Sequence, residues 1–265
     1  MEVIQSYLYI YYANVVIYNN LIFRVLSNVY IKQISVNLKY SRAVNKFYLC
    51  FDVWIKFVLP ERGGLCNFVV DNATIKMKRI AIFASGSGTN ALNIINYFNG
   101  NAGNGAEVAL VVCNRKDAGI VPRAEAVGVP VLVMTRNEIN DEKLMLSVLE
   151  QYKVDIIALA GFLLMVPSFI IERYEGKIVN IHPSLLPKFG GKGMFGANVH
   201  RAVVESGEKE TGITIHYVSE HCDGGQIIFQ AKVAVTPDDT PETIEAKVHT
   251  LEYEHYPRII KEKFI

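Results

Sequence analysis

The chain has 265 residues, a hydrophobic content of 51% and a formal net charge of +1. This length suits one large domain or a domain with an appendage, and the apolar content is ample for a buried core. A nearly neutral chain has no global field that would attract nucleic acid or an anionic membrane surface. The four cysteines stand far apart with no C-x-x-C pair. That spacing argues against a disulfide framework or a zinc ribbon and favours a reducing cytoplasm.

Residues 1–76 differ in composition from the rest of the chain. They contain eight of the 14 tyrosines but only two of the 19 glycines and none of the six histidines. Glu2 stands where a signal peptide needs basic residues, and polar residues interrupt the apolar run that a membrane span would need. We treat 1–76 as an atypical N-terminal extension. Our hypothesis is that it is upstream sequence read in frame, outside a native protein that begins at Met77 and forms one domain over 77–265.

From residue 77 onward, apolar strands alternate with glycine turns and helices. The sequence predicts buried strands at 79–83, 106–114, 129–134, 154–162 and 177–181, with helices at 91–98, 120–127 and 141–152. Nearly continuous apolar strands separated by helices are typical of a parallel sheet covered on both faces. We therefore expect an α/β fold with a Rossmann-like, mostly parallel sheet.

The last third of the chain has a different pattern. Two long alternating strands are predicted at 211–219 and 225–235, with a turn between them, as expected of antiparallel strands added to the sheet. A helix then closes the chain. Thr240 is its expected N-cap residue, and Pro241 occupies the first turn, where a missing N–H does no harm.

The first predicted strand leads into "FASGSGTN", which ends at Asn90. Its glycines would let the backbone approach a ligand, and the helix that follows offers free N–H groups to an anion. The segment is neither a G-x-G-x-x-G motif nor a Walker loop. A phosphate monoester therefore suits it better than a dinucleotide, and the alternative is an ordinary tight turn.

A second candidate is the strand that runs into "KIVNIHPSLLPKFGG", from Lys177 to Gly191. Alternate strand residues point the same way, so Asn180 and His182 would share one face. They lie at the carboxyl end of a predicted parallel strand, where ligands of open α/β sheets collect. A structural histidine is the alternative. His216, on a later strand, either orients this site or is a satisfied core histidine.

The third candidate is "SEHCDGGQII", in which Asp223 precedes two glycines, a common turn choice. With Asn180 and His182 it could move an acyl group between two nitrogens. Asn180 would donate to the oxyanion, an imidazolium at His182 would stabilise it, and Asp223 would hold the imidazolium and relay a proton. No nucleophile is required. No second cluster with ligand spacing accompanies His221-Cys222-Asp223, so we expect no metal.

These segments, taken in order, resemble the phosphoribosylglycinamide formyltransferase family. The resemblance rests on "RIAIFASGSGTN", "DIIALAGFLLMVP", "NIHPSLLPKFGG", "TGITIHYVSEHCDGGQIIFQAKVAV" and "LEYEHYP", and it covers 77–265 only. It implies transfer of a formyl group from 10-formyltetrahydrofolate, the co-substrate, to the amine of glycinamide ribonucleotide in de novo purine (IMP) biosynthesis. It also implies a cytoplasmic monomer or homodimer that acts on small molecules.

The same resemblance implies site residues, position by position. The family's catalytic residues are matched by Asn180, His182 and Asp223. Its phosphate-binding loop is matched by Gly88, Thr89 and Asn90, and its ribose contact by Glu252. The pterin of the folate would lie against Leu163, Met165 and Val166, inside a turn made by Glu220, His221, Cys222 and Gly224.

Two departures from the family pattern bear on the site. Leu164 stands where many members carry an arginine, which puts the folate-tail contacts in doubt, and the glycine-rich segment 189–199 is longer than usual. We expect that segment to be mobile.

Two rival functions stay open. One is a formyltetrahydrofolate hydrolase, which delivers the formyl group to water, and the other is a non-catalytic phosphate- or nucleotide-binding module.

Overall fold

The computed structural model describes residues 8–11, 14–17, 55–57, 68–70, 77–100 and 105–265. The chain divides into two compact units, Met1–Ile75 and Lys76–Ile265. In the first unit, β1 (Leu8–Tyr11) pairs antiparallel with β2 (Asn14–Ile17), and β3 (Ile55–Phe57) pairs antiparallel with β4 (Phe68–Val70). The sequence did not predict these short strands, and the hypothesis about the origin of residues 1–76 stays a prediction.

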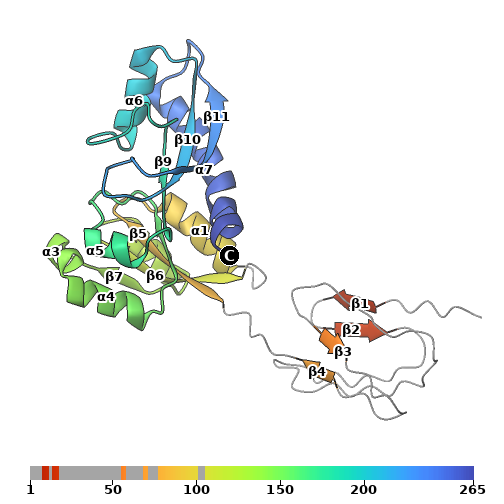
Figure 1. Cartoon of the computed structure of the whole chain (residues 1–265). Helices are drawn as coiled ribbons and strands as arrows, with labels where there is room; N and C mark the ends of the chain where they lie inside the picture. Colours follow the sequence, from red (N-terminus) through yellow and green to blue (C-terminus); the bar gives the residue numbers. More distant parts are fainter. Residues whose placement is uncertain (1–7, 12–13, 18–54, 58–67, 71–76, 101–104) are drawn as a thin grey trace, which may run out of the picture. The chain divides into compact units, whose positions relative to one another are not determined.

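The second unit alternates strands and helices and runs from orange to blue in Figure 1. Its strands are β5 (Lys78–Ala84), β6 (Ala106–Cys113), β7 (Val131–Val133), β8 (Ile156–Leu159), β9 (Ile178–His182), β10 (Glu210–Tyr217) and β11 (Ile227–Ala234). Its helices are α1 (Thr89–Asn99), α2 (Ile120–Ala126), α3 (Arg136–Asn140), α4 (Glu142–Gln151), α5 (Ser168–Arg173), α6 (Ala197–Ser206) and α7 (Pro241–Phe264).

The seven strands form one sheet in the order β11-β10-β9-β8-β5-β6-β7. The pairs from β9 to β7 are parallel, and the two pairs that involve β10 are antiparallel. This arrangement confirms the predicted mostly parallel sheet with antiparallel strands added late in the chain. Strand β6, which follows β5 in the chain, lies on one side of β5 in the sheet, and the later strand β8 lies on the other side. Ligands of such sheets bind at this switch point, beyond the carboxyl ends of the strands.

Helices cover both faces of the sheet because the strand side chains alternate between two apolar cores. Ile80 and Ile82 of β5 pack with residues of α1, α2 and α7, whereas Ala81 and Phe83 pack with residues of α3, α4 and α5. A strand buried on both faces has to be apolar along its buried length, as β5 is from Ile80 to Ala84. Figure 1 shows α1 beside α7, and α3, α4 and α5 grouped together away from them.

Helix α7 is fastened across the sheet by a buried tyrosine. The hydroxyl of Tyr256 lies 2.8 Å from the carbonyl oxygen of Leu159 at the end of β8 and 3.0 Å from that of Val179 in β9. The Tyr256 side chain is fully buried, and burial raises the pKa of its phenol well above the usual range. The hydroxyl therefore stays protonated and donates to these carbonyls, which ties the last helix to the strand that carries Asn180 and His182.

Pro257 lies inside α7 and cannot donate the helical hydrogen bond to the carbonyl of Tyr253. The side-chain amide of Asn93, on α1, donates to that carbonyl instead, at 2.9 Å. An interior proline normally leaves one helix carbonyl without its partner. Here a neighbouring helix supplies the partner, so α1 and α7 are joined at that position.

Three short helices were not predicted: α3, α5 and α6. The first had a usable signal, because Thr135 and Glu138 form a capping box in which each side chain bonds the other's backbone N–H. The third follows the glycine-rich segment, which does not predict a helix beyond it. The N-cap of the last helix was predicted correctly, since the Thr240 side chain accepts from the N–H of Thr243. Among the described residues, no helix is long and apolar enough to cross a membrane.

Replacing Tyr256 with phenylalanine should leave two buried carbonyls without their donor. We expect Tyr256→Phe to lower the free energy of unfolding by about 1–3 kcal/mol, as measured by urea denaturation. Tyr253→Phe is the matched control, because Tyr253 is 40% exposed. Its effect should stay within about 0.5 kcal/mol. Equal effects of the two substitutions would contradict the role given to the Tyr256 hydroxyl.

Candidate active site

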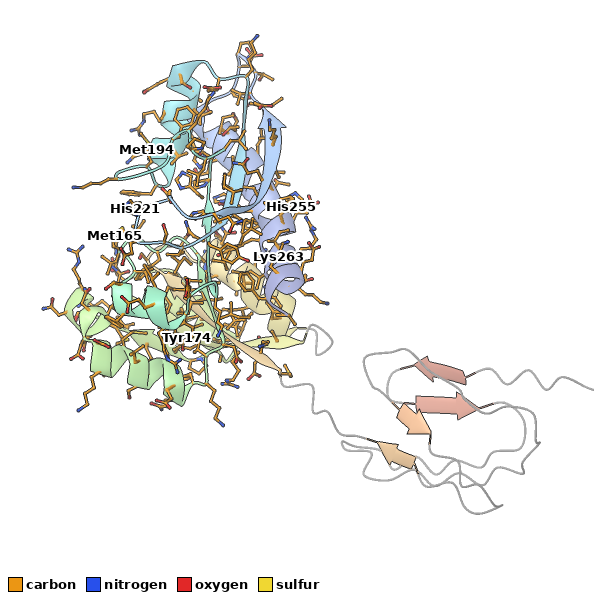
Figure 2. All side chains as sticks on the ribbon, viewed as in Figure 1. Met165, Tyr174, Met194, His221, His255 and Lys263 are labelled. Atoms are coloured by element: carbon orange, nitrogen blue, oxygen red, sulfur yellow. The ribbon has the colours of Figure 1, made fainter. Side chains whose placement is uncertain are left out.

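The candidate catalytic residues come from two paired strands and the turn beyond them. Asn180 and His182 lie on β9. The alternate residues of this strand, Val179 and Ile181, pack into the core on the other face of the sheet. Strand β10 runs antiparallel to β9 and pairs His216 with Asn180. The chain then turns and brings Asp223 back over the end of β9. Figure 2 labels His221 in that turn, between Met194 and Met165 in this view.

His182 is buried, and each of its ring nitrogens faces an oxygen. Nε2 lies 2.8 Å from the carbonyl oxygen of Phe189, and Nδ1 lies 3.5 Å from Oδ2 of Asp223. The Asp223 oxygen also accepts a hydrogen bond of 2.8 Å from the backbone N–H of Gly191. A doubly protonated imidazole can donate in both directions at once. The two oxygens can therefore accept from both ring nitrogens of His182.

The segment that follows His182 thus forms part of the site. Sequence reasoning predicted that residues 189–199 would be mobile, but it did not assign them contacts with the catalytic residues. Phe189 adopts a positive φ of 54°, and a Cβ added at Gly190 would lie 2.5 Å from the Leu186 side chain and 3.4 Å from Cβ of Asp223. The close approach at this glycine is what lets the flanking carbonyl and N–H reach His182 and Asp223.

Asn180 is oriented by His216. Burial lowers the pKa of His216, although its bond to Tyr217 and the nearby Asp223 oppose that shift, so the ring is neutral at pH 7. Its Nδ1–H donates to the carbonyl of Tyr217 at 2.8 Å, which leaves Nε2 to accept from Nδ2 of Asn180 at 3.0 Å. The second hydrogen on that amide nitrogen is then available to a ligand. Because His216 is neutral, its 3.7 Å approach to Asp223 is not an ion pair.

Asp223 sits in a constrained turn. Its φ of 54° is left-handed, a region in which aspartate and asparagine are enriched among residues other than glycine. A Cβ added at Gly225 would collide with the carbonyl of Tyr217, so the turn closes only with glycine there. The residues predicted to surround the pterin are all exposed in this turn: Glu220, His221, Cys222 and Gly224.

Cys222 is a free thiol beside the catalytic carboxylate. Its Sγ lies 3.8 Å from Oδ2 of Asp223, and desolvation by the surrounding atoms of the turn together with that negative charge raises the pKa of the thiol. A thiol with a raised pKa is a poor nucleophile at neutral pH. That the chemistry needs no protein nucleophile stays a prediction.

The predicted phosphate loop lies at the end of β5. Gly88 is buried and left-handed, with a φ of 76°, and a Cβ at this position would collide with Ile120. Thr89 and Asn90 are the first residues of α1, and no side chain caps the helix. The first N–H groups of α1 therefore lack a side-chain partner, and such groups bind anions.

Asn90 joins this loop to the residue predicted to contact the ribose. Its Nδ2 donates to Oε2 of Glu252 at 2.8 Å, and the same oxygen is 2.6 Å from Nδ1 of His249. Glu252 is only 4% exposed. The bond to Glu252 is the main reason that the pKa of His249 is raised, with Glu245 as a weaker contributor. Helices α1 and α7 thus hold a carboxylate beside the loop through two donors.

The predicted pterin segment follows β8. Leu163 and Met165 have exposed side chains, 49% and 52%, whereas Val166 is buried in the core. Leu164, which replaces an arginine of the family pattern, packs against that same core. One residue that sequence reasoning missed supports the segment: the buried hydroxyl of Ser85 accepts a hydrogen bond from the N–H of Leu163. Its place directly before the glycine loop was the only available signal.

The described contacts therefore form two groups: Asn180, His182 and Asp223 with their supports, and the glycine loop with Glu252. Two cavities lie elsewhere. One is lined by residues of 185–189, 208–211 and 230–232, and the other by residues of α4, α5 and the segment before β8. Neither cavity contains a predicted site residue, so the site is identified by its contacts. No group of three or more histidine, cysteine or acidic residues in the described part could hold a metal ion.

Comparison with known proteins identifies the family of this chain. Residues 78–260 match the family model described as formyl transferase. A chloroplastic phosphoribosylglycinamide formyltransferase from Arabidopsis thaliana is 40% identical over 190 residues, which are 70% of this chain and 65% of that protein. A phosphoribosylglycinamide formyltransferase from Haemophilus influenzae is 38% identical, over 70% of this chain and 86% of its own.

Solved structures give the same result for the fold. Glycinamide ribonucleotide transformylase 1 from Geobacillus kaustophilus superposes with a TM-score of 0.63 at 39% identity, covering 70% of this chain and 98% of that one. At this level of identity the likeness concerns sequence as well as fold. The chain spans 65% of the length of the Arabidopsis relative.

The pair of His249 and Glu252 gives a prediction about pH. Because the pKa of His249 is raised above its ordinary 6.5, the stability that the pair contributes should be complete below pH 6.5. It should be lost as the pH rises through the raised value. NMR titration of the His249 ring should give a midpoint above 6.5, and Glu252→Gln should lower it. A midpoint at or below 6.5 in the unmodified protein would contradict the assigned contact.

Proposed function

The chain belongs to the formyl transferase family, and we propose that it transfers a formyl group from 10-formyltetrahydrofolate to the amine of glycinamide ribonucleotide. The observation that carries the proposal is a continuous set of contacts that runs from Asn180 to His216, from His216 to Asp223 and from Asp223 to His182. Asn180, His182 and Asp223 each supply a group that acyl transfer between nitrogens needs. The glycine loop and Glu252 suit the phosphate and ribose of such an acceptor.

In the proposed reaction the acceptor nitrogen attacks the formyl carbon, and a C–N bond forms. The carbonyl oxygen becomes an oxyanion, to which the free Nδ2 hydrogen of Asn180 donates while the imidazolium of His182 stabilises the charge. The bond between the formyl carbon and the folate nitrogen then breaks. The proton lost by the acceptor amine and the proton gained by the folate nitrogen are exchanged through His182 and Asp223, directly or through water.

The donor would lie over the exposed side chains of Leu163 and Met165 and within the turn that precedes Asp223. Because Leu164 is turned into the core, a charged folate tail would have to be held by other residues than the one at position 164. We further propose that the partners are these small molecules alone, that the protein acts in the cytoplasm, and that it is a monomer or a homodimer.

Absorbance on mixing the full chain with 10-formyltetrahydrofolate tests the proposal. Loss of the formyl donor that depends on added glycinamide ribonucleotide would support it. Loss without the acceptor would instead indicate a hydrolase, and no loss under either condition would indicate a binding module. Each of the last two outcomes would overturn the proposed transfer.

Replacing Asp223 with asparagine removes the negative charge of the side chain and keeps its shape. Asparagine tolerates the left-handed backbone and can still accept from Gly191, so the fold should be retained. Without the carboxylate, we expect kcat to fall by a factor on the order of a thousand. Asp238→Asn, in the exposed turn before α7, is the control and should leave kcat unchanged. A turnover near that of the wild type would contradict the role of Asp223.

A further inference from the structure

Ser85 connects the ends of two neighbouring strands. It directly follows β5 and is 1% exposed. Its Oγ accepts a hydrogen bond of 2.9 Å from the N–H of Leu163, and its own N–H donates to the carbonyl of Gly161 at 3.1 Å. Strands β5 and β8 are parallel neighbours, so both segments emerge at the same edge of the sheet. Two hydrogen bonds thus fix the segment after β8 to the residue that directly precedes the glycine loop.

The two segments that Ser85 joins carry different substrates in the proposed function. Gly88 and Asn90, a few residues further on, belong to the acceptor's phosphate loop. Leu163 begins the apolar surface on which the donor would lie. Its side chain is half exposed, and its backbone N–H donates to the buried hydroxyl of Ser85. A residue as buried as Ser85 acts on a ligand through the backbone of its neighbours. It is therefore a positioning residue.

We propose that Ser85 couples the two subsites, so that an acceptor bound at the glycine loop strengthens donor binding at Leu163. The inference rests on the proposed function. A phosphate on the backbone N–H groups after Ser85 would hold that residue and, through its hydroxyl, the backbone of Leu163. Binding of the first ligand would then order both the glycine loop and the segment at Leu163. The second ligand would bind more tightly, because the entropy cost of ordering its segment would already have been met. The effect has to be reciprocal between donor and acceptor.

Calorimetric titration of the full chain with glycinamide ribonucleotide, with and without saturating tetrahydrofolate, measures this coupling. In the wild type we expect tetrahydrofolate to lower the Kd of the acceptor about fivefold or more, a typical coupling between sites. In Ser85→Ala the ratio should fall below about twofold. Ser206→Ala is the matched control, because the Ser206 hydroxyl donates to the Val203 carbonyl in its own helix. It should keep the wild-type ratio.

A wild-type ratio in Ser85→Ala would overturn the inference, as would a ratio of one in the wild type while formyl transfer proceeds. A wild type that neither binds the acceptor nor transfers the formyl group would overturn the proposed function as well. Amide hydrogen exchange at Leu163 gives a second measurement that needs no substitution. Acceptor alone should slow exchange at this amide, and unchanged exchange would count against the coupling.

Discussion

One carboxylate oxygen connects the end of β9 and the segment after it with the turn between β10 and β11. Oδ2 of Asp223 accepts from Gly191 and lies against Nδ1 of His182, and the turn that presents it closes against Tyr217 of β10. The register of β10 against β9 determines where that turn lies relative to the end of β9. If the register of this pairing slipped by one residue, His216 would no longer lie opposite Asn180, and the Asp223 carboxylate would shift relative to Asn180 and His182.

The histidines near the site are held in different charge states by their surroundings. His216 is kept neutral by burial and uses its lone pair to orient an amide, whereas His249 is held toward the charged form by two carboxylates. His182 lies between a carbonyl and a carboxylate. The same side chain thus serves as an acceptor at His216, has a raised pKa at His249 and faces an oxygen on both sides at His182, and the neighbours of each ring decide which.

Much of this arrangement could be predicted from the sequence, because strand period and strand ends are local properties. Alternation placed Asn180 and His182 on one face, and the apolar runs predicted the parallel strands but not their order in the sheet. The contacts made by Phe189 and Gly191 could not be predicted, since they depend on a left-handed backbone and on the distance between two segments. Ser85 was missed for the same reason: its partner is 78 residues away. The glycines after Pro187, expected to be mobile, include one that closes the catalytic cluster.

The contact between α1 and α7 links the evolution of two positions, Asn93 and Pro257. Pro257 removes one backbone donor, and Asn93 replaces it from another helix. A residue with an N–H at 257 would compete with the Asn93 amide for the same carbonyl, and loss of the asparagine alone would leave that carbonyl without a side-chain donor. Selection should therefore act on the two positions jointly, and orthologous sequences should tend to keep or exchange both rather than one.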